Sequence, residues 1–359
     1  MRDVDAGVSK TEASTTPTST TESVSVSTPS KSTESSDDSA SFGSDGRANH
    51  INSPSPSAAL FDDLVPPFVF NCSYYFTENE CRKGDPRRSY VDRYHYANTT
   101  NIYLFVVNHH WDKFSGLNFF RAVYFPRFSR LFKYSFDVVY LAPHCFPEQR
   151  VCAHRLRVGG EYSYYTLSIG YQLFHGIQPY QYAGFFLLND DGFLDPLYLN
   201  EYDLNKSHHE PTRKFNPKAV WSWNMMKNEH GTPYLKALVH AVNETISIPA
   251  LENRCHLSDD QNIRRSLQDY FYVVKEDIPL FLTLSSIFYK HRVFLEQAAP
   301  TINWCISKNV INTCNHHFWP NVTTCVHLHP VKLGHLSQQF LVMNHINRRD
   351  MTAKAAMSW

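Results

Sequence analysis

The stretch "YAGFFLLNDDGFLDP", Tyr182–Pro196, decides how this sequence folds. Its apolar and aromatic run, Ala183–Leu188, predicts a buried β-strand. The run stops at Asn189, Asp190 and Asp191, so a chain that has just formed a buried strand places two adjacent carboxylates at its end. Adjacent carboxylates repel one another and are costly to bury unless a cation neutralises them.

The segments before this stretch predict an α/β fold. "NIYLFVVNHHW" (Asn101–Trp111) and "FDVVYLAP" (Phe136–Pro143) read as buried strands, and "SGLNFFRAVYF" between them fits a short helix. "EYSYYTLSIGYQLF" is a helical candidate that leads into the Tyr182 strand. This order is typical of a mixed, mainly parallel sheet flanked by helices. Ligands of such sheets bind at the carboxyl ends of the strands, where 108–111 and 189–191 would meet.

Three further elements are expected downstream. "DYFYVV" (Asp269–Val274) predicts a strand. "EDIPLFLTLSSIFYKH" predicts a helix with Asp277 as its N-cap and one apolar face. "VFLEQAAPTINWCI" is a second helical candidate, interrupted by Pro300.

Composition separates a tail from a globular domain. Residues 1–63 are dominated by Ser, Thr, Pro and acidic residues, which predicts a disordered tail or stem before a domain at 64–359. Lys+Arg and Asp+Glu both number 34, and this balance argues against nucleic acid or an anionic membrane surface as the main partner.

Cysteines and glycosylation sequons predict the secretory pathway. The chain has eight Cys and no CxxC pair, and four spacings suit local disulfides: Cys72/Cys81, Cys145/Cys152, Cys305/Cys314 and Cys314/Cys325. Five Asn begin N-x-S/T sequons: Asn71, Asn98, Asn205, Asn243 and Asn321. We therefore expect a Golgi or ER lumen protein. Neither a signal peptide nor an apolar stretch of membrane-spanning length is visible, so its membrane anchor would be missing from this sequence. A cytoplasmic protein with buried free thiols is the second choice.

The two carboxylates suit a divalent cation. Mg²⁺ and Mn²⁺ prefer oxygen ligands, and a cation held by one or two carboxylates commonly completes its coordination with substrate phosphates. A solvated Asn-Asp-Asp-Gly turn is the alternative, because all four residues favour turns.

"GFFLLNDDGFLDP" resembles the DxD-type motif of GT-A glycosyltransferases, which follows a buried strand of the nucleotide-binding half. The resemblance in arrangement runs from about Asn101 to Lys332, and only 189–191 matches a motif. It implies a GT-A-like (Rossmann-like) fold with a donor half at about 100–195 and an acceptor half at about 196–340. It also implies an enzyme that binds a nucleotide sugar through Mn²⁺ or Mg²⁺ and transfers the sugar to a glycan or glycoprotein hydroxyl.

The resemblance also implies roles for single residues. Asp191 would be the direct metal ligand, with Asp190 on the ribose or the water shell of the metal. His329 or His327 would be a further ligand, and Lys332 a phosphate partner. Asn108, His109 and Trp111 end the first strand, where the base and ribose would bind. Trp111 is equally plausible as a core residue, and a single histidine among the 19 of this chain is more often an ordinary surface or core residue.

A carboxylate base is expected if the enzyme inverts. Asp269 and Glu296 are the candidates, although a buried pair with Arg or Lys explains Glu296 as well. Trp221 and Trp223 alternate and could stack on an acceptor sugar, or belong to the core.

Two other functions compete with a glycosyltransferase. A nucleotidyltransferase usually has a Gly-rich loop after its first strand, and "VVNHHWDKFSG" has only Gly116. The sequence has no GxxxxGK[ST] loop, which argues against a kinase or ATPase, and no GxSxG elbow, which argues against a serine hydrolase. The other alternative is a catalytically silent luminal protein that binds glycans or a partner on a transferase-like fold.

Overall fold

The computed structural model describes residue 64 and the segments 68–96, 99–109, 115–132, 134–156, 160–217, 226–311, 313–315 and 327–329. These residues belong to a compact unit, 54–359. The expected disordered tail, 1–63, lies outside the described residues. Among the helices of the described segments, none is long and apolar enough to cross a membrane.

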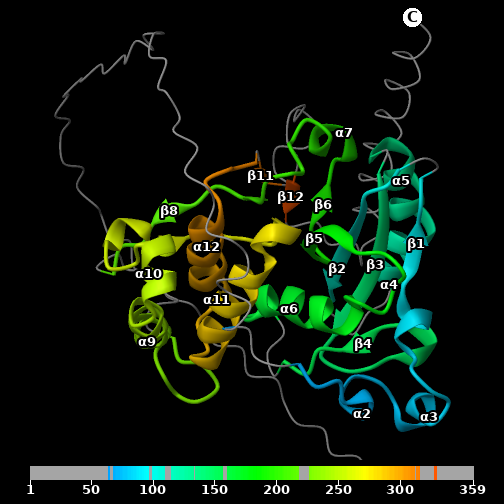
Figure 1. The fold of residues 1–359 in the computed structure, drawn as a ribbon, viewed down its shortest axis with the longest axis horizontal. Coiled ribbons are helices and arrows are strands. Elements are labelled where there is room, and N and C mark those ends of the chain that lie inside the picture. The colour runs from blue at the N-terminus through cyan, green and yellow to red at the C-terminus, as the bar shows by residue number, and fades with distance from the viewer. Residues whose placement is uncertain are drawn as a thin grey trace, which may run out of the picture. The chain divides into compact units, whose positions relative to one another are not determined.

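A mixed sheet of seven strands forms the centre of the unit (Figure 1). The strand order is β1-β3-β2-β5-β10-β7, with β4 beside β3. The strands are β1 (Asp92–Tyr94), β2 (Ile102–Asn108), β3 (Ser135–Ala142), β4 (Cys152–Ala153), β5 (Tyr182–Asn189), β7 (His208–His209) and β10 (Tyr270–Val274).

The sheet is mixed, as expected, and its long central ladders are parallel. β2 pairs in parallel with β3 and β5, and β3 with β4. The outer pairs β1–β3, β5–β10 and β10–β7 are antiparallel. Parallel neighbours require a crossover connection, whereas antiparallel ones do not. Only the β2–β3–β5 centre is built from the predicted βαβ units.

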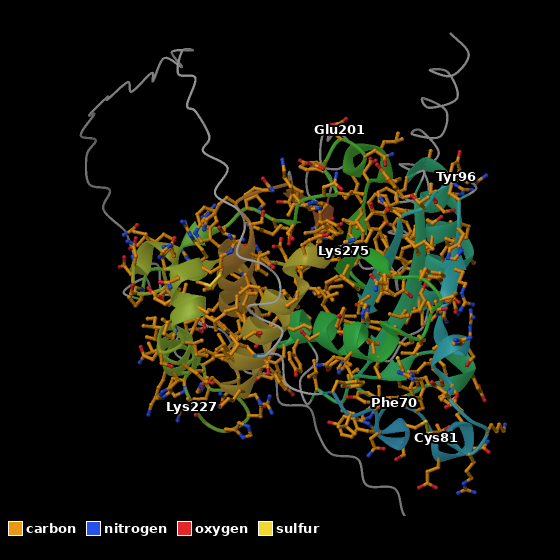
Figure 2. All side chains as sticks on the ribbon, viewed as in Figure 1. Phe70, Cys81, Tyr96, Glu201, Lys227 and Lys275 are labelled. Atoms are coloured by element: carbon orange, nitrogen blue, oxygen red, sulfur yellow. A yellow bond between two sulfur atoms is a disulfide. The ribbon has the colours of Figure 1, made fainter. Side chains whose placement is uncertain are left out.

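Helices cover both faces of the sheet, because alternate side chains of each buried strand point to opposite faces (Figure 1). Leu104 and Val106 of β2 pack with one group of helices, and Phe105 and Val107 with the other. The first group is α6 (Ser163–Phe174), α9 (Tyr234–Ile246), α11 (Ile278–Lys290) and α12 (Leu295–Ile306). The second is α4 (Ser115–Phe119), the π-helical turn η2 (Phe120–Tyr124) and α5 (Phe125–Phe132). Side chains fill the space between these layers (Figure 2).

The helix expected at "SGLNFFRAVYF" is longer than predicted. It continues from α4 through η2 into α5, past Pro126. Pro126 is the second residue of α5, and the wider π-helical turn lies directly before it. A proline is tolerated in a first helical turn, and single π-helical turns occur inside α-helices.

Pro300 does not interrupt α12, which also corrects an expectation. A proline lacks the N–H that would bond the carbonyl four residues earlier, here that of Glu296. The Ser266 N–H donates to this carbonyl instead, at 3.1 Å. The helix therefore runs through its proline without leaving that acceptor unpaired.

Asp277 occupies the N-cap position of α11, as predicted, but its side chain makes no cap hydrogen bond. Ser207 Oγ donates to Asp277 Oδ2 at 2.6 Å instead. Burial raises the pKa of the Asp277 carboxyl. Its carboxylate therefore links the loop before β7 to α11 rather than capping the helix.

The remaining elements are short. The helical ones are α2 (Cys72–Tyr75), α3 (Glu78–Cys81), η1 (Arg87–Tyr90), η3 (Pro147–Gln149), α7 (Pro196–Leu199), α10 (Pro249–Cys255), η4 (Asp260–Asn262) and η5 (Lys275–Asp277). Two small sheets complete the unit, β11-β12-β6 and β8-β9. Their strands are β6 (Phe193–Leu194), β8 (Arg213–Lys214), β9 (Arg264–Arg265), β11 (Thr313–Asn315) and β12 (His327–His329).

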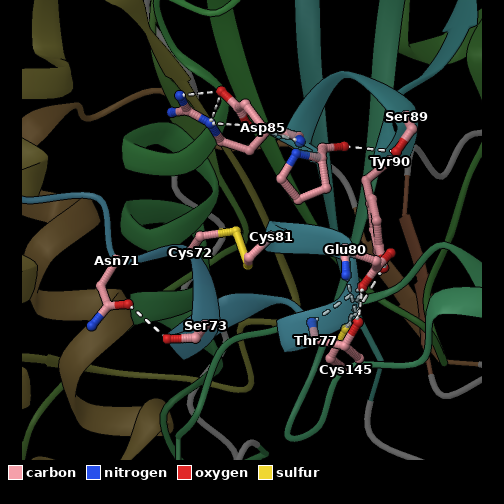
Figure 3. The surroundings of a disulfide bond; sticks show 12 residues. Asn71, Cys72, Ser73, Thr77, Glu80, Cys81, Asp85, Ser89, Tyr90 and Cys145 are labelled. Carbon is pink, nitrogen blue, oxygen red and sulfur yellow. Dashed lines mark hydrogen bonds and ion pairs between the residues drawn. A yellow bond between two sulfur atoms is a disulfide. The ribbon is translucent and has the colours of Figure 1, made fainter. Parts of the chain in front are cut away.

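The described residues contain two disulfides, and only one of them has a predicted pairing. Cys72–Cys81 joins α2 and α3 as expected (Figure 3). Cys305 pairs with Cys255, 50 residues away, and not with Cys314. This pairing ties α10 to α12, a contact that local spacing could not predict.

The expected Cys145–Cys152 disulfide is not formed, and both residues are free thiols. Cys152 is fully buried, and its Sγ lies 3.5 Å from the Tyr140 carbonyl oxygen. Cys145 Sγ instead lies 3.7 Å from Tyr90 Oη, beside the α3 capping box (Figure 3). Cys325 and the Cys314 side chain lie outside the described residues.

The covalent features fit a secreted or luminal protein. Disulfides persist in oxidising compartments. The sequon residues Asn71, Asn205 and Asn243 are exposed, as glycan attachment requires. Asn98 and Asn321 lie outside the described residues.

Candidate functional site

The carboxyl ends of β2 and β5 lie side by side, and polar side chains extend from both. Asn108 stands opposite Asn189 in the parallel register. Asn108 Nδ2 donates to Asn189 Oδ1 at 3.1 Å, and Thr166 Oγ1 in the first turn of α6 donates to Asn108 Oδ1 at 3.3 Å. The Asn108 amide therefore fixes the start of the Asn-Asp-Asp motif, from inside the protein.

His109 and Asp190 follow these two asparagines and remain paired. The Asp190 N–H donates to the Asn108 carbonyl at 3.0 Å, which continues the alignment beyond the strands. His109 Nδ1 lies 2.5 Å from Asp190 Oδ2, and the two side chains are only 2% and 4% exposed. The structure thus brings together two residues that were predicted at the donor site, and holds the Asp190 carboxylate against an imidazole.

Asp191 differs from its neighbours in exposure. Asn189 and Asp190 are buried, whereas Asp191 is partly exposed. The turn that carries it is closed by the Gly192 N–H, which donates to the Asn189 carbonyl at 2.9 Å. Asp191 is therefore the motif carboxylate that a ligand can reach.

Asp269, a predicted base, lies at the motif. It precedes β10, the antiparallel neighbour of β5. Asn189 Nδ2 donates to Asp269 Oδ1 at 2.5 Å, and the Asn189 N–H donates to the Asp269 carbonyl at 3.0 Å. The Asp269 side chain is thus held by the first residue of the motif.

Glu210 was not predicted, yet it connects the motif to the C-terminal histidines. Its Oε2 accepts the Asp269 N–H at 2.8 Å, and its Oε1 lies 2.7 Å from His327 Nδ1. Both side chains are buried. These partners are 59 and 117 residues away, so no local pattern could have revealed the contacts.

His327 faces the motif turn. A Cβ atom added to Gly192 would lie only 2.6 Å from His327 Nε2. The Glu210 carboxylate engages Nδ1, which is the arrangement that orients metal-binding histidines. Of the two histidines considered as ligands, His327 is therefore placed at the motif. His329 lies two residues further along β12, and its side chain is outside the described residues.

Burial makes the neighbouring histidines neutral. Removal from water, together with His209, lowers the pKa of His208 to about 3, and burial also lowers the pKa of His209. His209 Nδ1 lies 2.6 Å from the Glu210 carbonyl oxygen. The imidazoles at this end of β7 therefore add no positive charge beside Glu210 at neutral pH.

The other predicted site residues are less informative. Glu296 is buried in the first turn of α12. Its backbone carbonyl accepts the Ser266 N–H, and Ser266 belongs to the segment that leads to Asp269. Trp111, Lys332, Trp221 and Trp223 lie outside the described residues.

The residues present fit a cation that is shared with a ligand. Within the described segments, no group of three or more His, Cys, Asp or Glu side chains could hold a metal ion by itself. Asp191 lies in the motif turn that His327 Nε2 faces, and a cation with these two protein ligands would take its remaining ligands from phosphate or water.

Comparison with known proteins adds no assignment: the chain matches no protein-family model and no curated protein. What is established is an α/β protein with a polar cluster at the carboxyl ends of its central parallel strands.

Proposed function

We propose that this protein is a metal-dependent glycosyltransferase of the GT-A type, which transfers a sugar from a nucleotide sugar to a hydroxyl of a glycan or protein. One observation carries the proposal. The Asn-Asp-Asp motif continues β5 at the carboxyl edge of the sheet, with Asn189 and Asp190 held inside by Asp269 and His109, and Asp191 partly exposed. Ligands of open α/β sheets bind at this edge.

Some of these residues would bind the cation, and others would orient the residues that bind it. Asp191 and His327 would bind Mn²⁺ or Mg²⁺ together with the donor diphosphate, and Glu210 would keep His327 Nε2 turned toward them. The cation would stabilise negative charge on the departing nucleoside diphosphate. Asp190, held by His109, would face the ribose or the water shell of the cation. Asn108 and His109, like Asp190, would lie beside the bound nucleotide sugar.

Asp269 is the better candidate for the base that deprotonates the acceptor hydroxyl. It contacts the motif through Asn189, whereas Glu296 lies on α12. A base must be within hydrogen-bond reach of the reacting proton, directly or through one water. The Cys72–Cys81 and Cys255–Cys305 disulfides support an oxidising compartment, and we propose the Golgi or ER lumen.

Release of nucleoside diphosphate tests the proposal. The full chain would be incubated with a panel of UDP- and GDP-sugars, a glycan mixture and Mn²⁺. We expect release from one donor, abolished by chelation and reduced about a hundredfold or more in Asp191→Asn. Asp203→Asn, an exposed turn aspartate, is the matched control and should keep the wild-type rate.

Equal rates for wild type and Asp191→Asn would contradict this assignment of the motif. A folded wild-type protein that releases nucleoside diphosphate from no donor would favour the silent, glycan- or partner-binding alternative.

A further inference from the structure

A two-stranded ribbon composed only of basic residues lies outside the central sheet. β8 and β9 pair Arg213 with Arg265 and Lys214 with Arg264. Like charges directly opposite one another destabilise a strand pair. The whole chain has a net charge of zero, so this concentration of cations is local and not a consequence of composition.

One face of the ribbon joins further cations around Trp304. Arg264 Cζ lies 3.7 Å from the centre of the Trp304 ring, and Lys308 Nζ lies 3.9 Å from it. Arg254 Nη2 donates to the Ile306 carbonyl at 3.0 Å and acts electrostatically on Lys308. We call this the Trp304 cationic site: Lys214, Arg254, Arg264 and Lys308.

The scaffold of this site is rigid. Cys255 and Cys305, which neighbour Arg254 and Trp304 in sequence, form the disulfide between α10 and α12. Thr301 of α12 exchanges hydrogen bonds with the backbone of Arg264, at 3.0 and 3.1 Å. The cations are therefore held together by covalent and backbone contacts, which lowers the entropic cost of binding a ligand.

The positive charge of the site is incompletely compensated. Asp260 Oδ1 lies 3.3 Å from Lys214 Nζ, and Asp259 acts on Arg264. Both aspartates are exposed, and such pairs are weak. Within the described part of the chain no ion pair involves Arg254, Arg264 or Lys308, and Arg264 Nε is buried without a hydrogen-bond partner. Burial, Arg264 and Arg254 together lower the pKa of Lys308 to about 8.

We propose that the Trp304 cationic site binds a sulfate or carboxylate group of an anionic polysaccharide. Guanidinium groups bind such oxyanions through paired N–H donors, and the partly exposed Arg254 and Arg264 both carry such a group.

The ribbon also links this site to the motif. It continues the β7–β10 pair, so Arg265 lies only four residues before Asp269, at most about 14 Å of extended chain. A polysaccharide held at Trp304 could therefore extend to the candidate active site. This choice of a carbohydrate partner rests on the proposed function, whereas the binding of an oxyanion does not.

Nucleic acid fits the site less well. Single-stranded nucleic acid is bound by stacking its bases on aromatic rings. The Trp304 ring is already in contact with Arg264 and Lys308. The two disulfides also fit a secreted or luminal protein, which would meet polysaccharides rather than nucleic acid.

Calorimetry with three probes of one backbone tests the proposal: dextran sulfate, carboxymethyl dextran and uncharged dextran, added to the full chain without nucleotide or Mn²⁺. We expect dextran sulfate or carboxymethyl dextran to bind, and uncharged dextran not to bind. Arg264→Gln/Lys308→Gln should weaken binding about tenfold or more. Arg213→Gln/Lys83→Gln is the matched control, since Arg213 lies on the other ribbon face and Lys83 is exposed in the turn after α3. It should change affinity less than about twofold.

Proton uptake by Lys308 would distinguish binding at this site from general charge attraction. An anion beside it raises its pKa, so binding at pH 8 should take up protons, measured in two buffers of different ionisation enthalpy. The exposed single variant Lys308→Gln guards against misfolding and should lose this uptake together with affinity.

Equal binding by the Arg264/Lys308 variant and its control would overturn the proposal. So would preferential binding of RNA of matched length or of phosphatidylserine vesicles over both charged dextrans. Because no nucleotide or Mn²⁺ is present, this outcome is independent of whether the transferase proposal holds.

Discussion

His208 shows at the scale of one residue how burial controls protonation near the candidate site. Its ring lies between aromatic side chains, and Nε2 lies 2.8 Å from Tyr270 Oη. The folded protein binds a proton here only near pH 3, whereas the unfolded chain binds it below about pH 6.5. Stability therefore falls as the pH falls from 6.5 toward 3, because protons favour the unfolded chain.

This difference predicts a pH dependence that can be measured. Between pH 7 and pH 5, His208 should reduce the free energy of unfolding by about 2 kcal/mol. Urea unfolding at both pH values should show a smaller change for His208→Gln than for wild type. His144→Gln, at an exposed histidine, should leave the change as it is. An unchanged pH dependence in His208→Gln would show that His208 is not a buried neutral group.

Single residues also show what the sequence could and could not reveal about the site. Asp190, Asp191 and Asp269 could be selected because each lies within three residues of an apolar run. Glu210 could not, since β7 has two residues and no periodic pattern, and its partners are far away in sequence. A buried carboxylate that accepts hydrogen bonds from two distant elements is a product of the tertiary fold.

At the scale of elements, continuous apolar runs predicted β2, β3, β5 and β10 well. Helices that contain proline were predicted less well. Proline is expected to break a helix because it lacks an N–H donor. At Pro300 the Ser266 N–H, which lies outside α12, replaces that donor. The helix could be recognised from its sequence, but its continuity depended on a neighbouring segment.

The contact between β12 and the motif turn gives a prediction at this scale. A Cβ at Gly192 would lie 2.6 Å from His327 Nε2 and 2.9 Å from Leu188 Cδ1. Gly192→Ala should therefore lower the free energy of unfolding by about 1–3 kcal/mol through overpacking. Denaturant unfolding of the full chain measures this loss.

A double-mutant cycle identifies the cause. In a His327→Ala background the imidazole is absent, so Gly192→Ala should cost less than half of its effect in wild type. Additive effects of the two substitutions would show that His327 does not pack against the motif turn.

At the scale of the whole molecule, the sequence predicted an α/β protein but not the direction of every strand. Local pattern identifies a strand, while direction depends on the route by which the chain returns to the sheet. The long segment between β5 and β10 returns antiparallel to β5. Local pattern could not predict the Cys255–Cys305 disulfide either, since its two helices meet only in the folded unit.

The central claim is that a divalent cation bridges the motif to a nucleoside diphosphate. The most direct measurement is the affinity of the full chain for UDP and GDP with and without Mn²⁺, and for Mn²⁺ with and without the nucleotide. A bridging cation requires each ligand to strengthen the other by the same factor, and we expect about a hundredfold. This coupling should disappear in Asp191→Asn and persist in Asp203→Asn. Independent binding of cation and nucleotide, or coupling that survives in Asp191→Asn, would contradict the account.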